Sequence, residues 1–218
     1  MTPFSTDRDL LALEPEAFND LAFFAQLRVS VNDAEVTQTD LTSVNANFET
    51  AQIEPGHIAV VDRHPCEVVA RTDAMSLTLS ALRTQTSDPA IPPTVQGAGL
   101  SLRIRTFAPQ ARLVGLDLLQ ALGVDPEDAT AQAENRPTED AILSLNRMAQ
   151  LEALGTLHRL YAAASAVDTR QEAFLHKAEH YRSAFREALR KATVLIDVNQ
   201  DGLPEERRSF AVAPLRRA

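Results

Sequence analysis

The sequence predicts an α+β fold, a helical bundle built on two long antiparallel helices, together with a small antiparallel β module and extended arms. From Phe174 to Leu195, apolar residues recur at spacings of four and three, which places them on one face of a helix. Residues 76–80 and 100–105 instead alternate apolar and polar side chains, the period of a β-strand. With 218 residues, 44% of them hydrophobic and 23% charged, the chain has a globular composition.

We expect four segments along the chain. Residues 1–56 form an N-terminal arm and short helix, 57–107 the β module, 108–202 the helical bundle and 203–218 an Arg-rich C-terminal tail. In the first segment, Ser5, Thr6 or Asp7 can cap a short helix that ends before Pro15. Residues 29–54 are rich in Thr and Asn and carry no helical stripe, which favours irregular structure or an edge strand.

The β module is expected to contain four short strands joined by connections that hairpins can use. Residues 84–99 include three prolines and two glycines, so they cannot continue a strand or a helix. We expect this Pro/Gly-rich loop to be mobile, or to extend as an arm toward a neighbouring molecule. The four predicted strands are His57–Val61, Glu67–Arg71, Ser76–Leu82 and Leu100–Phe107.

Three helices follow. The first runs from about Gln110 to Leu122 and ends at Gly123. The second starts at residues 138–140, and its large apolar residues recur every third position up to Leu160. That spacing carries the stripe once around the helix, so the helix needs several neighbours, and symmetry mates are expected to supply some of them. Gly155 in its middle suggests close approach of another backbone, and the third helix begins at Gln171 to complete an antiparallel hairpin.

Charge and hydropathy limit the partners. The net charge is 21 − 30 = −9, and the acidic residues concentrate in the first 136 residues, which argues against tight binding to duplex DNA. No apolar run is long enough to span a membrane, and the N-terminus is too polar for a signal peptide, so we expect synthesis in the cytoplasm and no membrane contact. The single cysteine, Cys66, is either a packed side chain or a reactive thiol.

One motif could bind zinc. The run His176-Lys177-Ala178-Glu179-His180 matches the inverted zinc-protease pattern H-x-x-E-H, in which two imidazoles share a helix face beside a glutamate that activates water. His176, Glu179 and His180 would then be the site of a zinc-dependent hydrolase. The alternative is a solvated helix face, because these residues lie opposite the apolar stripe.

A second motif could bind calcium. Asp197, Asn199, Asp201 and Gly202 reproduce positions 1, 3, 5 and 6 of a calcium loop, but position 12 is Arg208 in place of glutamate. The pattern therefore predicts, at most, a partial Ca²⁺ site at Asp197, Asn199 and Asp201. Such a site would suit a calcium-responsive cytosolic adaptor, and the alternative is an Asx-type turn that stops the helix and reverses the chain.

Neither a nucleophile motif nor a glycine-rich phosphate loop occurs, so we expect a protein without catalytic activity or cofactor. The basic C-terminal end could contact a protein surface or phosphate, or be solvated. Its arginines are Arg207, Arg208, Arg216 and Arg217.

Three parts of the sequence resemble head–tail connector (adaptor) proteins of tailed bacteriophages. They are Ser76–Arg83, Thr106–Gln110, and the helix at Tyr181–Phe185 that leads into Ile196–Gly202. The resemblance implies a non-enzymatic subunit of a ring, commonly a dodecamer of twelve copies, in the virion neck. Its helical bundle would dock on the portal protein, its other side would meet a tail-side stopper or tail-terminator protein, and double-stranded DNA would pass through the central channel.

Overall fold

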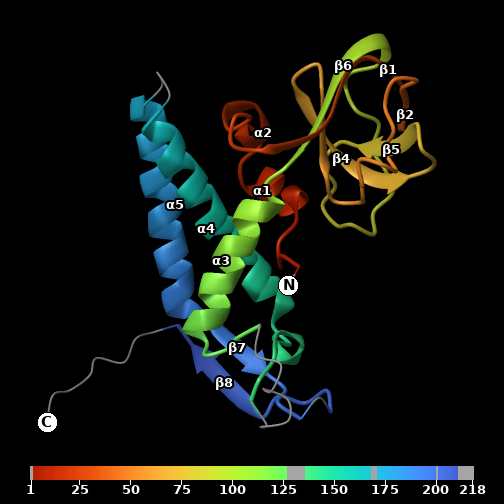
Figure 1. Cartoon of the computed structure of the whole chain (residues 1–218). Coiled ribbons are helices and arrows are strands. Elements are labelled where there is room, and N and C mark those ends of the chain that lie inside the picture. The colour runs from red at the N-terminus through yellow and green to blue at the C-terminus, as the bar shows by residue number, and fades with distance from the viewer. Residues whose placement is uncertain (1, 127–135, 168–170, 200, 211–218) are drawn as a thin grey trace, which may run out of the picture. The chain divides into compact units, whose positions relative to one another are not determined.

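The computed structural model describes residues 2–126, 136–167, 171–199 and 201–210. The chain forms two compact units (Figure 1). Thr6–Pro109 make up the first, here called the barrel unit, and Met1–Ser5 with Gln110–Ala218 the second, here called the helical unit. The chain therefore passes between the units twice, after Ser5 and after Pro109.

The barrel unit contains six antiparallel strands that close on themselves in the order β1-β2-β5-β4-β3-β6. Closure depends on β1, which pairs with β6 over most of its length and with β2 at its far end. Three irregularities in the β1–β6 register bend the long strand, as closure of so small a barrel requires. The strands are β1 (Gln26–Thr37), β2 (Asp40–Thr42), β3 (Ile58–Val61), β4 (His64–Arg71), β5 (Ser76–Ser80) and β6 (Gly97–Thr106).

The predicted fold class, a helical bundle with a small β module and extended arms, is therefore wrong. Four predicted strands are present as β3 to β6, and most of β1 with all of β2 lies in residues 29–54, which were expected to be irregular or an edge strand. Two strands paired on both sides in a closed barrel were not expected there, because β1 buries only Val29, Ala34 and Val36 and its other side chains are exposed or half-buried. Its partner β6 lies some 70 residues away on average, and no local pattern records such a pairing.

The Pro/Gly-rich segment does not extend as an arm, because hydrogen bonds return it to the barrel. Ala81 N–H donates to Ile91 O at 2.8 Å, and Ile91 N–H donates to the Ser80 hydroxyl at 2.8 Å. Arg83 donates to the carbonyl oxygens of Thr86 and Asp88 at 2.8 and 2.7 Å. The last residues of the segment form the start of β6.

Two short helices, α1 (Asp7–Leu13) and α2 (Ala17–Asp20), precede the barrel strands. Thr6 caps α1 in a reciprocal arrangement, with its N–H donating to Asp9 Oδ2 at 2.8 Å. Phe18 of α2 packs against Phe107 with ring centroids 5.0 Å apart, and both side chains are fully buried. The aromatic contact fixes the helical segment beside the end of β6.

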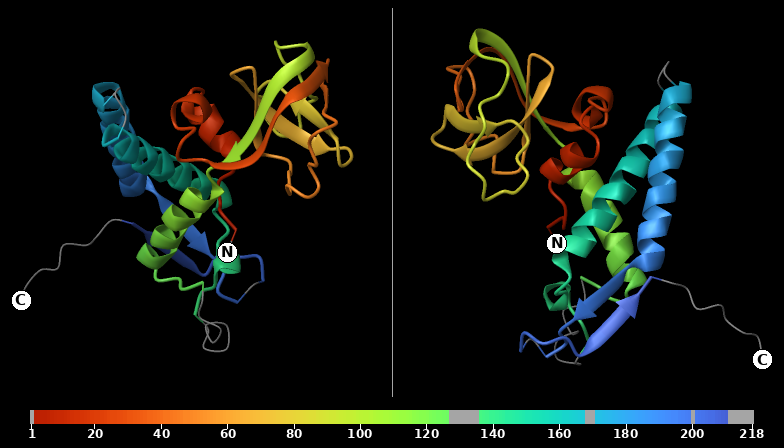
Figure 2. Two further views of the ribbon diagram at one scale, coloured as in Figure 1. Left: turned by 45° about the horizontal axis from the view of Figure 1, so that its top comes forward. Right: turned by 180° about the vertical axis from the view of Figure 1, so that it is seen from behind.

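The helical unit combines three helices with a two-stranded sheet at one end of them (Figure 2). Val114, Leu118 and Leu119 of α3 share a core with Met148 and Leu151 of α4 and with Val194 of β7. Nearer the other end, Tyr161 of α4 stacks on Tyr181 of α5 at 5.8 Å between centroids. The elements are α3 (Ala108–Ala121), η1 (Glu139–Ala141), α4 (Leu145–Ser165), α5 (Gln171–Lys191), β7 (Thr193–Ile196) and β8 (Glu206–Ser209).

The neighbours of α4 lie within the same chain. Every residue from Leu151 to Leu157 is buried, which confirms that the helix has contacts all around. At Gly155, a Cβ atom would lie 2.7 Å from Val114 Cγ1 of α3 and 3.2 Å from the Phe185 ring of α5. Side chains, not another backbone, therefore make the close approach, and symmetry mates are not needed to explain the spiral stripe.

Two helix boundaries differ from the expected ones. The second helix begins at Leu145 rather than at residues 138–140, where the separate short turn η1 (Glu139–Ala141) starts instead. The third ends at Lys191, so that Leu195, the last residue of the apolar stripe, belongs to β7. Across the described ranges, no helix combines the length and the hydropathy needed to cross a membrane.

Candidate functional site

The Asp-rich motif lies in the connection between β7 and β8. Asp197 is 4% exposed, and both of its carboxylate oxygens accept backbone hydrogen bonds. Oδ1 accepts from Asp201 N–H at 3.1 Å and Oδ2 from Gly202 N–H at 2.7 Å. Gly202 has a φ of +89°, which glycine tolerates better than other residues. The motif therefore forms a turn organised by Asp197.

The remaining side chains of the motif also bond within the turn. Asn199 Oδ1 accepts from Asp201 N–H at 2.9 Å, Asp201 Oδ1 from Leu203 N–H at 2.9 Å, and Glu205 Oε2 from Val198 N–H at 2.7 Å. The structure brings together carboxylate oxygens of Asp197, Asp201 and Glu205, all within 4.8 Å of one another. Glu205 joins the group from outside the predicted ligand set, and Asn199 contacts it through Asp201 Oδ2 at 3.3 Å.

This geometry matches the expected Asx-type turn in that side chains complete a backbone reversal. The turn does not stop a helix as expected, because α5 ends at Lys191 and the turn joins β7 to β8. Calcium binding at Asp197, Asn199 and Asp201 stays a prediction. If millimolar calcium raised the melting temperature of the wild type and not of an Asp201→Asn variant, that result would support it.

The zinc motif lies on the exposed side of α5. His176 Nε2 is 4.0 Å from Glu172 Oε1, Glu179 Oε1 accepts from Arg182 at 3.1 Å, and the His180 ring stands edge-on to Tyr181. Among the described residues, the only set of three clustered His, Cys, Asp or Glu side chains is the acidic one in the β7–β8 turn. The described residues thus provide no third ligand beside His176 and His180, and the geometry favours a solvated face.

Cys66 is a packed side chain of β4. It is 3% exposed among the apolar residues of the barrel core, and its Sγ lies 3.6 Å from His64 O. Burial raises the pKa of this thiol to about 11, so it is protonated at neutral pH. A buried, protonated thiol is a poor nucleophile, which disfavours the reactive-thiol alternative.

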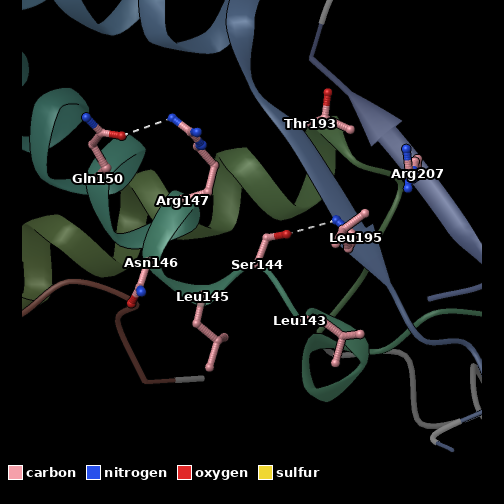
Figure 3. A pocket seen from close by; sticks show the side chains of 9 residues that line it. All are labelled: Leu143, Ser144, Leu145, Asn146, Arg147, Gln150, Thr193, Leu195 and Arg207. Atoms are coloured by element: carbon pink, nitrogen blue, oxygen red, sulfur yellow. Dashed lines mark hydrogen bonds between the residues drawn. The ribbon is translucent and has the colours of Figure 1, made fainter. Parts of the chain in front are cut away.

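A groove of about 730 Å³ lies where α4 begins beside β7. Residues 141–144 run along the edge of β7: Leu143 N–H donates to Leu195 O at 3.0 Å, and Leu195 N–H donates to the Ser144 hydroxyl at 3.0 Å. The chain then turns into α4, which begins at Leu145. Figure 3 shows the lining side chains, which are Leu143, Ser144, Leu145, Asn146, Arg147, Gln150, Thr193, Leu195 and Arg207.

The groove is both apolar and cationic. Leu143 is 41% exposed and Leu145 is 56% exposed, although leucine side chains normally favour the core. Arg147 and Arg207 supply positive charge, and no acidic residue is among the described residues of the lining. Within that described part of the lining the nucleophilic groups are hydroxyls, with no histidine, cysteine or carboxylate to activate them. Such a surface is suited to binding an apolar side chain next to a carboxylate.

The sequence did not reveal this groove. Both Leu143 and Leu145 were expected inside the second long helix, and Leu145 was part of its spiral stripe. The basic end was noticed, but its two described arginines have different positions. Arg207 lines the groove, whereas Arg208 donates to Leu122 O at the end of α3 and to Glu206 Oε2. Arg216 and Arg217 lie outside the described residues.

Known proteins give no guide to the groove or to the turn. Comparison of this chain with protein-family models, with curated proteins and with solved structures finds no match.

Proposed function

We propose that this chain is a non-enzymatic structural subunit of a tailed-phage virion, a head–tail connector (adaptor) that forms a ring in the neck. In this role it is synthesised in the host cytoplasm and assembles with copies of itself between the portal protein and a tail-side stopper or tail-terminator protein. The resemblance in residues 76–83, 106–110 and 181–202 suggests the connector family. It also implies a ring of twelve copies, a dodecamer.

The observation that carries an assembly role is the groove beside β7. Leu143 and Leu145 are 41% and 56% exposed, and both line this one depression together with Arg147 and Arg207. An exposed apolar depression with cationic side chains at its margin is typical of a protein-binding surface. The described lining also lacks a histidine, cysteine or carboxylate for general acid or base catalysis.

The charge of the chain supports passage of DNA over tight binding to it. A net charge of −9 repels the phosphate backbone, and a channel built from such subunits would let a duplex slide. Local basic groups such as Arg147 and Arg207 then serve contacts between proteins.

The test combines mass measurement with imaging. Analytical ultracentrifugation of the purified chain is expected to give a species whose mass is a multiple of 23.8 kDa, and negative-stain images are expected to show rings with a central hole. Immunogold labelling should place the protein at the neck of mature particles. A chain that stays monomeric at all concentrations and is absent from particles would refute the proposal.

A further inference from the structure

Phe23 is exposed to an extent that is unusual for an aromatic residue. It lies between α2 and β1, and 89% of it is accessible to solvent. Its ring stands edge-on to Phe24, with centroids 5.5 Å apart. Leu27, four residues further along at the start of β1, is 52% exposed. Large aromatic side chains contribute most when they enter a partner's pocket, so Phe23 has the character of an interface anchor.

The surroundings of Phe23 in the sequence are acidic. Glu14, Glu16 and Asp20 precede it, and no basic residue occurs between Arg8 and Arg28. The barrel unit as a whole, residues 6–109, has 7 basic and 14 acidic residues, a balance of 7 − 14 = −7. The groove has the opposite chemistry, since its charged lining residues are Arg147 and Arg207.

We propose that Phe23 of one copy inserts into the groove of a second copy of this chain, with the acidic residues before it facing Arg147 and Arg207. The inference rests on the proposed function, because it names the contact by which copies would join. A groove of about 730 Å³ falls in the size range of pockets that hold a group larger than one ring, so part of the segment near Leu27 can enter with Phe23.

The contact is heterologous: each copy supplies one anchor and one groove on different surfaces. Repetition of such a contact generates a ring if the rotation closes and a filament if it does not. Opposite charges around an apolar anchor also select the orientation and accelerate encounter at low salt. Assembly by this contact is therefore expected to weaken as the salt concentration rises.

Two single variants and their mixture test the contact. Phe23→Ser removes the aromatic anchor, and Leu145→Asp places a negative charge in the apolar part of the groove. Both positions are exposed, so the fold should be retained. Each variant alone is expected to associate at least about 30-fold more weakly than the wild type, the effect of losing an interface hot spot. The equimolar mixture is expected to give a 1:1 heterodimer, because one intact anchor and one intact groove remain.

Matched controls lie elsewhere on the surface. Val44→Ser changes a residue of the barrel unit that is 79% exposed, and Leu113→Asp changes a leucine of α3 that is 57% exposed, next to 56% for Leu145. Both controls are expected to assemble like the wild type. Circular dichroism melting curves that match across all four variants would show that lost association is not lost folding.

A disulfide cross-linking experiment can detect the contact even if the affinity between copies is low. Two differently tagged chains, one with Gln26→Cys near the intact anchor and one with Asn146→Cys beside the intact Leu145, are mixed under oxidising conditions at high protein concentration; both positions are exposed. A disulfide between the two tagged chains is expected, and a Val44→Cys chain in place of the Gln26→Cys chain should give none. Cys66 is buried and will not interfere.

The outcomes separate this inference from the proposed function. If the wild type forms rings and Phe23→Ser forms them equally well, the inference is overturned and the ring proposal stands. If only Leu145→Asp prevents assembly, the groove receives another segment and the assignment of Phe23 is overturned. If the wild type is monomeric, the ring proposal fails, and the presence or absence of the disulfide then decides for or against the contact.

Discussion

The barrel unit and the helical unit both use a buried carboxylate to hold irregular chain, but with different partners. Glu67, 1% exposed on β4, is bound by two arginines: Arg8 Nε lies 3.1 Å from Oε1, and Arg83 donates to both oxygens at 2.7 and 3.2 Å. Asp197 of the helical unit, by contrast, accepts the backbone N–H groups of its own turn. The first carboxylate joins distant segments, and the second shapes a local one.

Because Glu67 and Asp197 have different partners, removing each carboxylate leaves different groups without a hydrogen-bond acceptor. Removing Glu67 leaves two cations, of which Arg83 is only 7% exposed, and an uncompensated buried charge is costly. Removing Asp197 leaves N–H groups of Asp201 and Gly202, which are exposed residues and can bond to water. Loss of the Glu67 charge is therefore expected to destabilise the barrel unit more than loss of the Asp197 charge destabilises the helical unit.

The largest effect is expected for Glu67→Gln. Loss of the charge leaves Arg8 and Arg83 without their counter-ion, and the free energy of unfolding should fall by about 3–5 kcal/mol. The change in the free energy of unfolding is measured by urea titration, with far-UV circular dichroism as the signal. The matched control is Glu35→Gln on β1, an exposed carboxylate whose loss should cost no more than about 0.5 kcal/mol. Equal effects of the two substitutions would show that the buried ion cluster does not stabilise the barrel.

Next is Asp7→Asn, which is expected to stabilise the barrel unit at neutral pH. Asp7 is 6% exposed at the start of α1, and burial raises its pKa to about 6 from 3.8, although Phe107 N–H donates to it at 2.8 Å. A folded pKa above the unfolded one means that the charged form disfavours folding. Stability should therefore increase as the pH falls from above 6 towards 4, by up to about 3 kcal/mol from this group.

Asparagine keeps the acceptor for Phe107 N–H and does not ionise, so the variant should lack this contribution to the pH dependence. The measured quantity is the difference in unfolding free energy between wild type and variant at pH 4, 5, 6 and 7. All other carboxylates are common to both proteins and cancel. A difference that is constant across this range would contradict the assignment to Asp7.

A smaller loss is expected for Ser5→Ala in the helical unit. The Ser5 hydroxyl and N–H donate to Glu152 Oε2 at 2.7 and 2.5 Å, and Glu152 is fully buried in α4. The substitution removes the hydroxyl donor and keeps the backbone one, so about 1.5–3 kcal/mol should be lost. Both tyrosines, Tyr161 and Tyr181, lie in this unit, so tyrosine fluorescence during urea unfolding reports on it. Ser209→Ala, at an exposed position of β8, serves as the control.

The smallest effect concerns Gly155→Ala. Alanine favours the helix over glycine by about 1 kcal/mol, but its Cβ would lie 2.7 Å from Val114 Cγ1, and overpacking costs about 1–3 kcal/mol. We expect a net loss of about 1 kcal/mol by tyrosine fluorescence. In a Val114→Ala background the clash is relieved, so the same substitution should become neutral or stabilising. If it destabilises both backgrounds equally, the contact with α3 is not the cause.

Local patterns located much of the secondary structure. Alternation along residues 76–80 and 100–105 predicted β5 and most of β6, and Gly123, whose φ is +70°, ends α3 as expected. The every-third spacing in α4 correctly indicated contacts on all sides. These features depend on side chains a few residues apart, so the sequence records them directly.

Features that depend on distant partners were missed. The same apolar stripe continues from Phe174 to Leu195, yet the helix stops at Lys191 because the next residues pair with β8. The groove is lined by two parts of the chain that lie far apart in the sequence, residues 143–150 and residues 193–207. Glu67 is unremarkable in the sequence, since its partners lie 59 and 16 residues away.

The sequence by itself determined the strands β3 to β6, the helix α3 and the turn chemistry of Asp197 to Gly202, because short-range periodicity and side-chain to backbone hydrogen bonds specify them. Three features became apparent in the tertiary structure alone. The strands close into a barrel, and the neighbours of α4 come from its own chain. The third is the groove, which is lined by Leu143, Leu145, Arg147 and Arg207. Each of these requires residues far apart in the chain to meet, and the free energy of such contacts depends on the whole fold rather than on any local pattern.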